Sequence, residues 1–180
     1  GILRRVVVVD TGEGILELKN DTVLNWFNLT NSSLETSTGT NNRYIRIGST
    51  TLDKEGNLWI STDKSLWCLE FNDEGAIQDY YHLEHGAQSS IHAIIDLGWC
   101  ICAGIDNHVC QIKRSPKHQL KVGNFSKLLE PFTQDWRILC METHGDDLWI
   151  GTNRGLFKYN HNKQTTQRYR YSSHRPGMLS

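Results

Sequence analysis

The residues best suited to metal or redox chemistry in this sequence are cysteines. Three of the five lie close together, at Cys100, Cys102 and Cys110. Their C-x-C spacing differs from the C-x-x-C of structural zinc sites and thioredoxin-like motifs, and an odd total does not suit a disulfide framework. Cysteine also behaves as a small hydrophobic residue inside strands. We therefore predict no metal or redox centre and interpret the cysteines as strand residues.

The histidines and carboxylates show no arrangement typical of catalysis. His82 and His85 form an H-x-x-H pair without a further ligand nearby in the sequence. Asp146 and Asp147 are adjacent residues of an expected turn, so their side chains point apart and do not form an acid–base pair. The sequence has no G-x-S-x-G elbow, phosphate-binding glycine loop or Asp-rich calcium loop. It therefore predicts a protein without catalytic residues, bound metal or cofactor.

Ligand binding is the chemistry that the polar residues between the apolar segments favour. Amide and charged side chains can hold the hydroxyls and the carboxylate or sulfate of a sugar. Arginine can form a bidentate contact with an anionic group, and tryptophan offers an apolar platform for a sugar ring. The candidate ligand contacts are Lys64, Asn107, His108, Trp136, Asn153 and Arg154. The elements around them must bring these residues together.

The composition argues against other partners. The 180 residues include 19 Lys and Arg against 20 Asp and Glu, which gives a net charge of −1. A nucleic-acid or anionic-membrane binder needs a basic surplus to displace counterions, so we predict neither. With 38% hydrophobic residues, the chain can form a core. No apolar run approaches the ~18 residues of a membrane span, so we expect any membrane attachment to come from regions outside this sequence.

The pattern of apolar residues predicts an all-β fold. Apolar runs of about five residues alternate with period two and are separated by turns that contain Gly, Asp or Pro. The expected inner strands include Ser90–Asp96 and Arg137–Glu142. The expected outer strands, which are more polar, include Gln78–His82 and Thr166–Tyr171.

An internal repeat organises these strands. Leu58–Thr62 and Leu148–Thr152 are nearly identical, Ile101–Ile105 is a third copy, and Val7–Thr11 is a weaker fourth. A repeat of ~40–50 residues made of strands is typical of β-propeller blades, each a four-stranded antiparallel sheet. The sequence therefore predicts a propeller segment of about four blades.

The repeat also predicts where the blades divide and how they pack. We assign the units to residues 1–42 (partial), 43–87, 88–133 and 134–180 of a single segment. Trp59 and Trp149 are expected to pack between neighbouring blades. The chain starts at the second strand of a blade and stops at a loop, His174–Ser180, before an inner strand. We therefore expect a part of a longer propeller, whose exposed blade edges favour self-association.

Propeller topology would bring the candidate contacts together. The loops between second and third strands, and those between blades, gather on one face around the channel. The six candidate residues lie in these loops, so we expect a ligand site on that face.

Two segments resemble a known family, the two-component regulator propeller repeat. They are Asp53–Thr62, with the pattern D-x-x-G-N-L-W-I-S-T, and Leu148–Asn160, with the pattern L-W-I-G-T-x-x-G-L-x-x-Y-N. The resemblance covers essentially the whole chain, although Cys102 stands at the Trp position of the third copy and Val8 at that of the first.

In that family the repeats build extracytoplasmic sensor propellers. These precede a membrane span and a histidine kinase, often in hybrid sensors of gut bacteria that detect oligosaccharides. The resemblance implies a periplasmic location, an oligosaccharide ligand and a dimeric receptor. It also implies that this segment has no enzymatic activity of its own.

Two other classes of propeller remain as alternatives. Bacterial lyases and lactonases carry similar Asp-x-x-Gly-x-x-Trp repeats, but they need a His with acidic partners, and usually a metal, at the channel. A protein-interaction scaffold, as in WD-repeat and kelch propellers, would bind a protein partner and show no response to glycans. We favour the non-enzymatic ligand sensor.

Overall fold

The structure is a computed structural model that describes residues 4–9, 14–19, 22–28, 35–36, 47–62, 65–73, 76–84, 91–117, 119–125 and 136–169. These residues form sixteen β-strands, and no helix occurs among them. The predicted all-β fold is therefore confirmed. The expected loop at His174–Ser180 lies outside the described residues.

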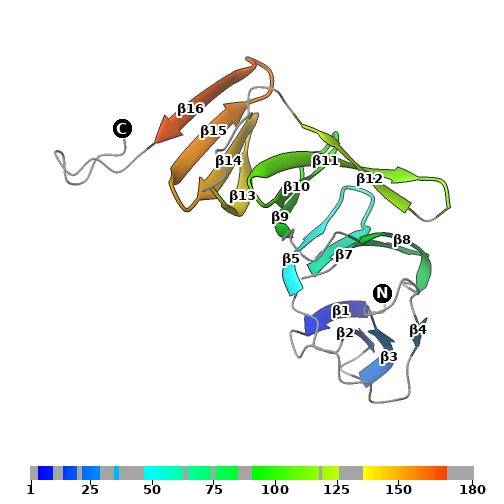
Figure 1. Ribbon diagram of the computed structural model, residues 1–180. Coiled ribbons are helices and arrows are strands. Elements are labelled where there is room, and N and C mark those ends of the chain that lie inside the picture. Colours follow the sequence, from blue (N-terminus) through cyan, green and yellow to red (C-terminus); the bar gives the residue numbers. More distant parts are fainter. Residues whose placement is uncertain are drawn as a thin grey trace.

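Four-stranded antiparallel meanders follow one another along the chain. The first contains β1 (Arg4–Val9), β2 (Gly14–Lys19), β3 (Thr22–Asn28) and β4 (Glu35–Thr36). The second contains β5 (Ile47–Leu52), β6 (Leu58–Thr62), β7 (Ser65–Phe71) and β8 (Ile77–Glu84). The third contains β9 (Ile91–Asp96), β10 (Ile101–Ile105), β11 (His108–Ser115) and β12 (Gln119–Asn124). The fourth contains β13 (Ile138–His144), β14 (Asp147–Thr152), β15 (Gly155–Asn160) and β16 (Thr165–Tyr169). Figure 1 shows the meanders in chain order.

The second and third meanders join into one eight-stranded sheet. Its strand order is β5-β6-β7-β8-β12-β11-β10-β9, so the outer strands β8 and β12 meet at the centre. They are linked by one parallel pair, Gln119 opposite His82. The sequence did not predict this link. It satisfies part of two strand edges that would otherwise lack a partner.

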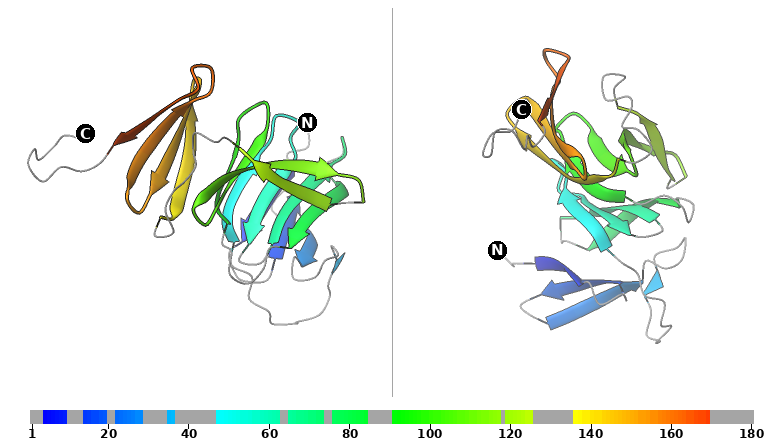
Figure 2. Two further views of the ribbon diagram at one scale, coloured as in Figure 1. Left: turned by 45° about the horizontal axis from the view of Figure 1, so that its top comes forward. Right: turned by 60° about the vertical axis from the view of Figure 1, so that its left-hand side comes forward.

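The first strands of the later meanders lie next to one another. β9 contacts both β5 and β13, and Figure 2 shows the fourth meander beside the third. Each of the three strands has a register shift near its start. The shift lies between Ile47 and Ser49 in β5, opposite Gly104 and Ile105 in β9, and between Ile138 and Cys140 in β13. A bulge of this kind bends and twists a strand.

The third meander is covered on both faces by its neighbours. One face places Ile94, Ile101 and Ile112 in a buried cluster with Trp59, Leu66 and Cys68 of the second meander. The other face places Ala93, Ile95 and Cys102 in a cluster with Met141, Leu148, Ile150, Phe157 and Tyr159 of the fourth. β10 is therefore almost fully buried, since residues 101–104 are buried and Ile105 is partly buried. Burial of apolar surface on both faces is the main force that holds the meanders together.

The contact between the Ile138 side chain and β10 requires a glycine between the third and fourth meanders. A Cβ atom at Gly104 would lie 2.6 Å from Cγ2 of Ile138. Ile138 is itself fully buried and is the first residue of β13. The absence of a side chain at Gly104 lets β13 pack directly against β10.

The two repeat tryptophans differ in burial. Trp59 is 2% exposed because the third meander covers it. Trp149 is partly exposed, since it lies on the face of β14 opposite Leu148 and Ile150, away from the third meander. There it stacks with Tyr169 at 5.7 Å, and the Lys158 ammonium lies 5.4 Å from its ring. No further meander covers this face among the described residues, so the expected packing of Trp149 between two meanders stays a prediction.

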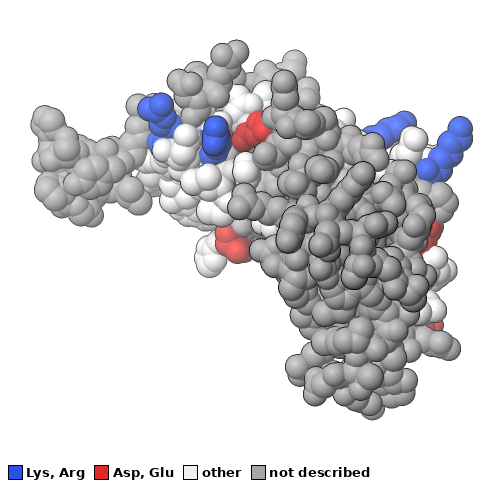
Figure 3. Space-filling model, turned by 60° about the horizontal axis from the view of Figure 1, so that its bottom comes forward, with Lys and Arg blue, Asp and Glu red and all other residues white. Residues whose placement is uncertain are grey.

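Charged residues do not form a patch of one sign in the described part of the view in Figure 3. Basic and acidic side chains there are scattered among uncharged residues. This distribution agrees with the near-zero net charge of the chain.

Candidate functional site

The described residues among the predicted ligand contacts lie at one edge of the meanders, and one of them has a structural role. The Oδ1 atom of Asn153 accepts a hydrogen bond from the backbone N–H of Arg137 at 2.9 Å, and the Asn153 N–H donates to the Arg137 carbonyl at 3.2 Å. The Ile138 N–H donates to the Asp106 carbonyl at 3.0 Å. These bonds fix the start of β13 against the turns that precede β11 and β15.

Trp136 lies beside the same turn, with one ring face covered. The Arg168 guanidinium carbon is 4.0 Å from its ring centroid, and Phe157 lies 5.2 Å away. A cation over the ring contributes about 0.5–2 kcal/mol of stabilisation. Trp136 therefore takes part in packing, and a sugar ring could contact only the part of the indole surface that Arg168 and Phe157 do not cover.

The other predicted contacts are divided between two turns. Arg154 is exposed, and its backbone N–H donates to Thr152 Oγ1 at 3.2 Å. Asn107 is partly buried and follows Asp106 in the β10–β11 turn, and His108 is exposed at the start of β11. Lys64 lies outside the described residues. The hydrogen bonds from Asn153 to Arg137 thus hold Asn153 next to the segment that contains Trp136. The bond between Asp106 and Ile138 connects the turn that contains Asn107 to the same segment.

The threonine of the repeat motif explains the shape of these turns. Thr152 Oγ1 donates to the Gly155 carbonyl at 2.8 Å, and Thr62 Oγ1 donates to the Ser65 carbonyl at 3.2 Å. Each bond closes the loop between the motif strand and the next strand. The third copy has Ile105 at this position and uses Asp106 with a φ of 52° instead, a conformation that Asp tolerates better than most residues.

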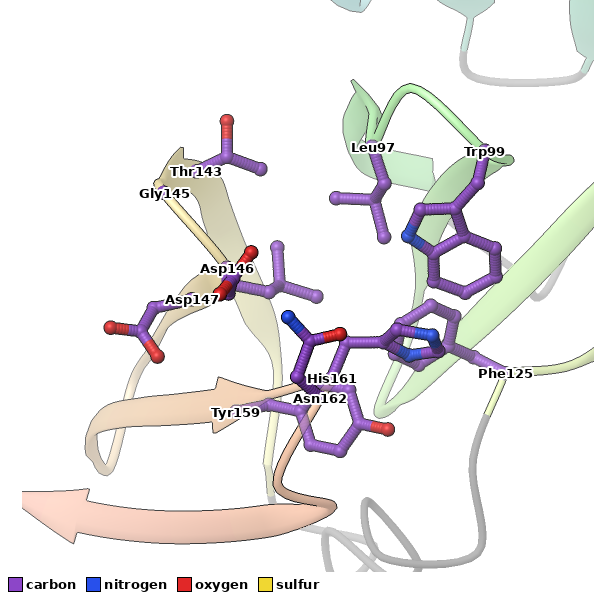
Figure 4. Close-up of a pocket in the computed structure, with 11 residues that line it drawn as sticks. Leu97, Trp99, Phe125, Thr143, Gly145, Asp146, Asp147, Tyr159, His161 and Asn162 are labelled. Atoms are coloured by element: carbon purple, nitrogen blue, oxygen red, sulfur yellow. The ribbon is translucent and has the colours of Figure 1, made fainter.

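Two cavities lie at the opposite edge of the meanders, next to the first turn of each. The first cavity has a volume of about 140 Å³ and lies between the β9–β10 turn and the β13–β14 turn. Figure 4 shows Leu97 and Trp99 on one side of it and Gly145, Asp146 and Asn162 on the other, with the His161 ring beside Trp99. The second cavity, of about 190 Å³, lies between the β5–β6 turn and the β9–β10 turn. Trp99 lines both cavities.

We call this edge, with its two cavities, the cavity edge. None of the described residues predicted from sequence to bind ligand lies there. Gly98 and Trp99 stand between the expected strand Ser90–Asp96 and the repeat copy Ile101–Ile105, and a tryptophan between two strands is the one sequence signal for this edge. Phe125 and His161, which complete its surroundings, lie far from it in sequence.

Aromatic rings define one wall of the first cavity. Trp99 stacks with His161 at 4.3 Å and with Phe125 at 5.7 Å. Phe125 meets the buried Tyr159 edge-on at 5.5 Å. Trp99 nevertheless stays 49% exposed. This places a supported indole at the surface, across the cavity from the carboxylate of Asp146 and the amide of Asn162.

Asp53 and the motif that follows it shape the second cavity. Asp53 Oδ1 accepts hydrogen bonds from the N–H groups of Glu55 at 3.0 Å and Asn57 at 2.8 Å. Its Oδ2 accepts from Asn57 Nδ2 and from the Trp59 indole, both at 2.9 Å. Burial opposes the charged form, but these hydrogen bonds outweigh it, and the pKa of Asp53 lies below its ordinary value. The D-x-x-G-N-x-W motif is therefore a structural device that anchors Trp59.

Other carboxylates near the two cavities are also engaged by the protein itself. Asp96 accepts hydrogen bonds from the N–H groups of Lys54 at 2.8 Å and Gly98 at 2.7 Å. Asp147 accepts from Asn160 and forms an ion pair with Lys158 at 2.7 Å; the hydrogen bond from Lys158 is the main cause of the lowered pKa of Asp147. Asp146 differs, because it is exposed and its side chain has no hydrogen-bond or ion-pair partner among the described residues.

Metal binding has no support in the described part of the chain. No three His, Cys, Asp or Glu side chains gather there in a way that would hold an ion. Within the same residues, no helix has the length and hydropathy to cross a membrane.

Comparison with known proteins relates the chain to solved structures. No family model and no curated protein sequence matches it. One similar structure is the extracellular domain of BT4673 from B. thetaiotaomicron, designated a hybrid two component system, with 17% identity and a TM-score of 0.58 over 97% of this chain and 22% of that one. Another structure of the BT4673 extracellular domain, designated there a one component system, has 16% identity and a TM-score of 0.55 over 97% of this chain and 28% of that one.

These similarities concern the fold and a part of each larger protein. At 16–17% identity the sequences themselves share little. The chain spans about a quarter of the length of the structures that it matches. Its all-β arrangement is thus one that occurs in the extracellular domain of a two-component signalling protein.

Proposed function

We propose that this chain is a segment of a ligand-sensing β-propeller in the extracytoplasmic part of a membrane-bound two-component sensor. The observation that carries the proposal is the similarity of 97% of the chain to the extracellular domain of BT4673. The location would be the periplasm, and the ligand an oligosaccharide. The segment itself would be non-enzymatic, with a histidine kinase elsewhere in the full-length protein.

The arrangement of the meanders supports a propeller. The second, third and fourth meanders each have four sequential antiparallel strands, and their first strands β5, β9 and β13 lie next to one another. The faces of the meanders pack through buried aliphatic and aromatic residues. In this proposal the four meanders are blades of a longer propeller, with units at residues 1–42 (partial), 43–87, 88–133 and 134–180.

Signalling would depend on unequal binding to two receptor arrangements. A ligand shifts a conformational equilibrium only by the difference between its affinities for the two states. Sugar binding to a propeller would therefore change the arrangement of a receptor dimer only if the contacts differ between those states. The rigid packing of consecutive meanders would transmit such a change as a movement of whole sheets.

Thermal unfolding in the presence of oligosaccharides tests the proposal. A ligand that binds only the folded protein raises its stability by about 2.7 kcal/mol at a hundred times the Kd. For a chain of this size, we expect a saturable increase of several degrees in Tm with at least one of the gluco-, xylo-, manno- or fructo-oligosaccharides. A cooperative unfolding transition that none of these sugars shifts would contradict an oligosaccharide sensor.

A further inference from the structure

The cavity edge combines features of a carbohydrate site that the sequence analysis did not assign. Its two cavities lie on either side of one exposed tryptophan, Trp99. Their volumes, about 140 and 190 Å³, are each below the range of pockets that enclose a drug-sized ligand. A ligand that uses both must therefore be an extended chain that passes over Trp99.

Contacts with two aromatic side chains hold Trp99 in a fixed orientation. His161 and Phe125 both stack with its indole, and Phe125 rests on the buried Tyr159. The turn that carries Trp99 is fixed by Asp96, which accepts a hydrogen bond from Gly98, where φ is +79°. An exposed apolar ring that is already immobilised loses little conformational entropy when a ligand stacks on it.

Polar groups next to the indole are available to hydroxyl groups. The Asp146 backbone is tied to the aromatic wall, because its carbonyl accepts a hydrogen bond from the His161 N–H at 3.3 Å. Its carboxylate has no hydrogen-bond or ion-pair partner among the described residues, and the exposed Asn162 lies beside it in the lining of the first cavity. Figure 4 shows the edge of the Trp99 indole that carries the nitrogen turned toward the cavity.

The charges around the first cavity favour a neutral ligand. Among the described residues that line it, Asp146 and Asp147 are the carboxylates, and none is Lys or Arg. Lys158 forms an ion pair with Asp147, whereas Asp146 has no ion-pair partner in the described part of the chain. Bringing a sulfate or uronate against Asp146 would place like charges together, which is unfavourable.

We propose that the cavity edge binds a neutral oligosaccharide, with one sugar ring stacked on Trp99 and its hydroxyls hydrogen-bonded to Asp146 and Asn162. The chain of sugars continues past Trp99 into the second cavity, where Lys54 and Glu55 lie exposed. This inference rests on the proposed function and assigns it a site. The site differs from the predicted contacts around Trp136 and Asn153, which lie at the opposite edge.

Titration calorimetry with neutral hexasaccharides of glucose, xylose, mannose and fructose tests the site. The variants are Trp99→Ala, Asp146→Asn and, as a control at the opposite edge, Trp136→Phe, which keeps an aromatic ring against Phe157 and Arg168. For the neutral sugar that binds the unmodified protein, we expect about a tenfold or greater loss of affinity in Trp99→Ala. Asp146→Asn should lose about three- to tenfold, and Trp136→Phe should bind as the unmodified protein does.

A fluorescence measurement guards against loss of folding in the variants. Addition of the same sugar should change tryptophan emission in Trp136→Phe but not in Trp99→Phe, provided that both variants keep the Tm of the unmodified protein. A sulfated hexasaccharide should bind more weakly than its neutral counterpart.

The outcomes separate the site from the function. If Trp136→Phe loses sugar binding while Trp99→Ala and Asp146→Asn retain it, the cavity edge is wrong and the proposed sensor function stands. Tighter binding of the sulfated sugar would overturn the charge argument and the proposal with it. If none of the sugars binds the unmodified protein, the oligosaccharide sensor and this site both fall.

Discussion

Single side chains in this protein stabilise the turns and anchor the larger residues. Asp53 illustrates this role, since a carboxylate that is 8% exposed accepts four hydrogen bonds, one of them from the Trp59 indole. A buried carboxylate is tolerated because each oxygen has donors. The repeat motif therefore specifies a local hydrogen-bond network in addition to apolar surface.

The network makes Asp53 a test of stability and its pH dependence. Asp53→Asn should lower the free energy of unfolding by about 1–3 kcal/mol at pH 7, because one amide group cannot accept all four hydrogen bonds. The pKa of Asp53 is lower in the folded state, so its contribution is complete above the unfolded value of about 3.9 and is lost as the pH falls through the folded value. The difference between the proteins should therefore shrink below about pH 4 in urea unfolding. Glu55→Gln, the same change at an exposed neighbour, should have little effect; an equal loss there would contradict the argument.

The cysteines should differ sharply in reactivity. Burial raises the pKa of Cys68 to about 12, and that of the fully buried Cys102 is raised further. Cys100 lies 3.6 Å from Cys102, Sγ to Sγ, and a hydrogen bond from Cys102 lowers its pKa. Because the thiolate is the reactive form, iodoacetamide should modify Cys100 and the exposed Cys140 well before Cys68 and Cys102. Mass spectrometry of the digested protein measures this order, and early labelling of Cys102 would contradict it.

Whole meanders pack through their faces, and the same sequence position can lie in different surroundings. Trp59 and Trp149 occupy equivalent positions in β6 and β14. The third meander covers Trp59, whereas Tyr169 and Lys158 cover only part of Trp149. The residues opposite these tryptophans also differ. Cys68 of β7 is buried, whereas the equivalent residue of β15, Lys158, forms an ion pair with Asp147.

This difference predicts unequal effects of truncation. Trp59→Ala should cost about 3–5 kcal/mol of unfolding free energy, as expected for a large buried side chain. Trp149→Ala should cost less, about 1–2 kcal/mol, because part of its surface is already in water. Urea unfolding of both variants provides the comparison, with each serving as the control for the other. Equal losses would show that a further surface covers Trp149 in solution.

On the scale of the molecule, the meanders are held by consecutive face-to-face contacts. The third meander has neighbours on both faces, while the fourth presents the Trp149 face without a covering sheet among the described residues. The strand β16 pairs only with β15 within the same residues. An uncovered sheet face that carries a partly exposed tryptophan and a strand edge without a partner both favour association with another chain.

We therefore expect the 180-residue chain to self-associate as its concentration rises. Light scattering coupled to size-exclusion chromatography should show a mass that increases with loading. A Gln167→Lys variant, which adds a charge to β16, should shift the equilibrium toward the monomer. A monomer mass that stays constant over a wide concentration range would contradict this expectation.

Several elements could be predicted from sequence because their signals are local. The expected inner strands Ser90–Asp96 and Arg137–Glu142 correspond to β9 (Ile91–Asp96) and β13 (Ile138–His144). Period-two alternation and turn residues depend on neighbours a few positions apart, so they can be read from the chain directly. The parallel contact between β8 and β12 had no such signal, because it joins residues 37 positions apart, His82 and Gln119.

The sequence alone determined the strands, the repeated turns and the all-β class. The tertiary structure decided which tryptophan is buried, which hydrogen bonds Asn153 makes and where a supported indole reaches the surface. Burial and cavity shape depend on what packs against a residue from other parts of the chain. The surroundings of Trp99 come from Phe125 and His161 as well as from its own turn, and only the folded arrangement places the three rings together.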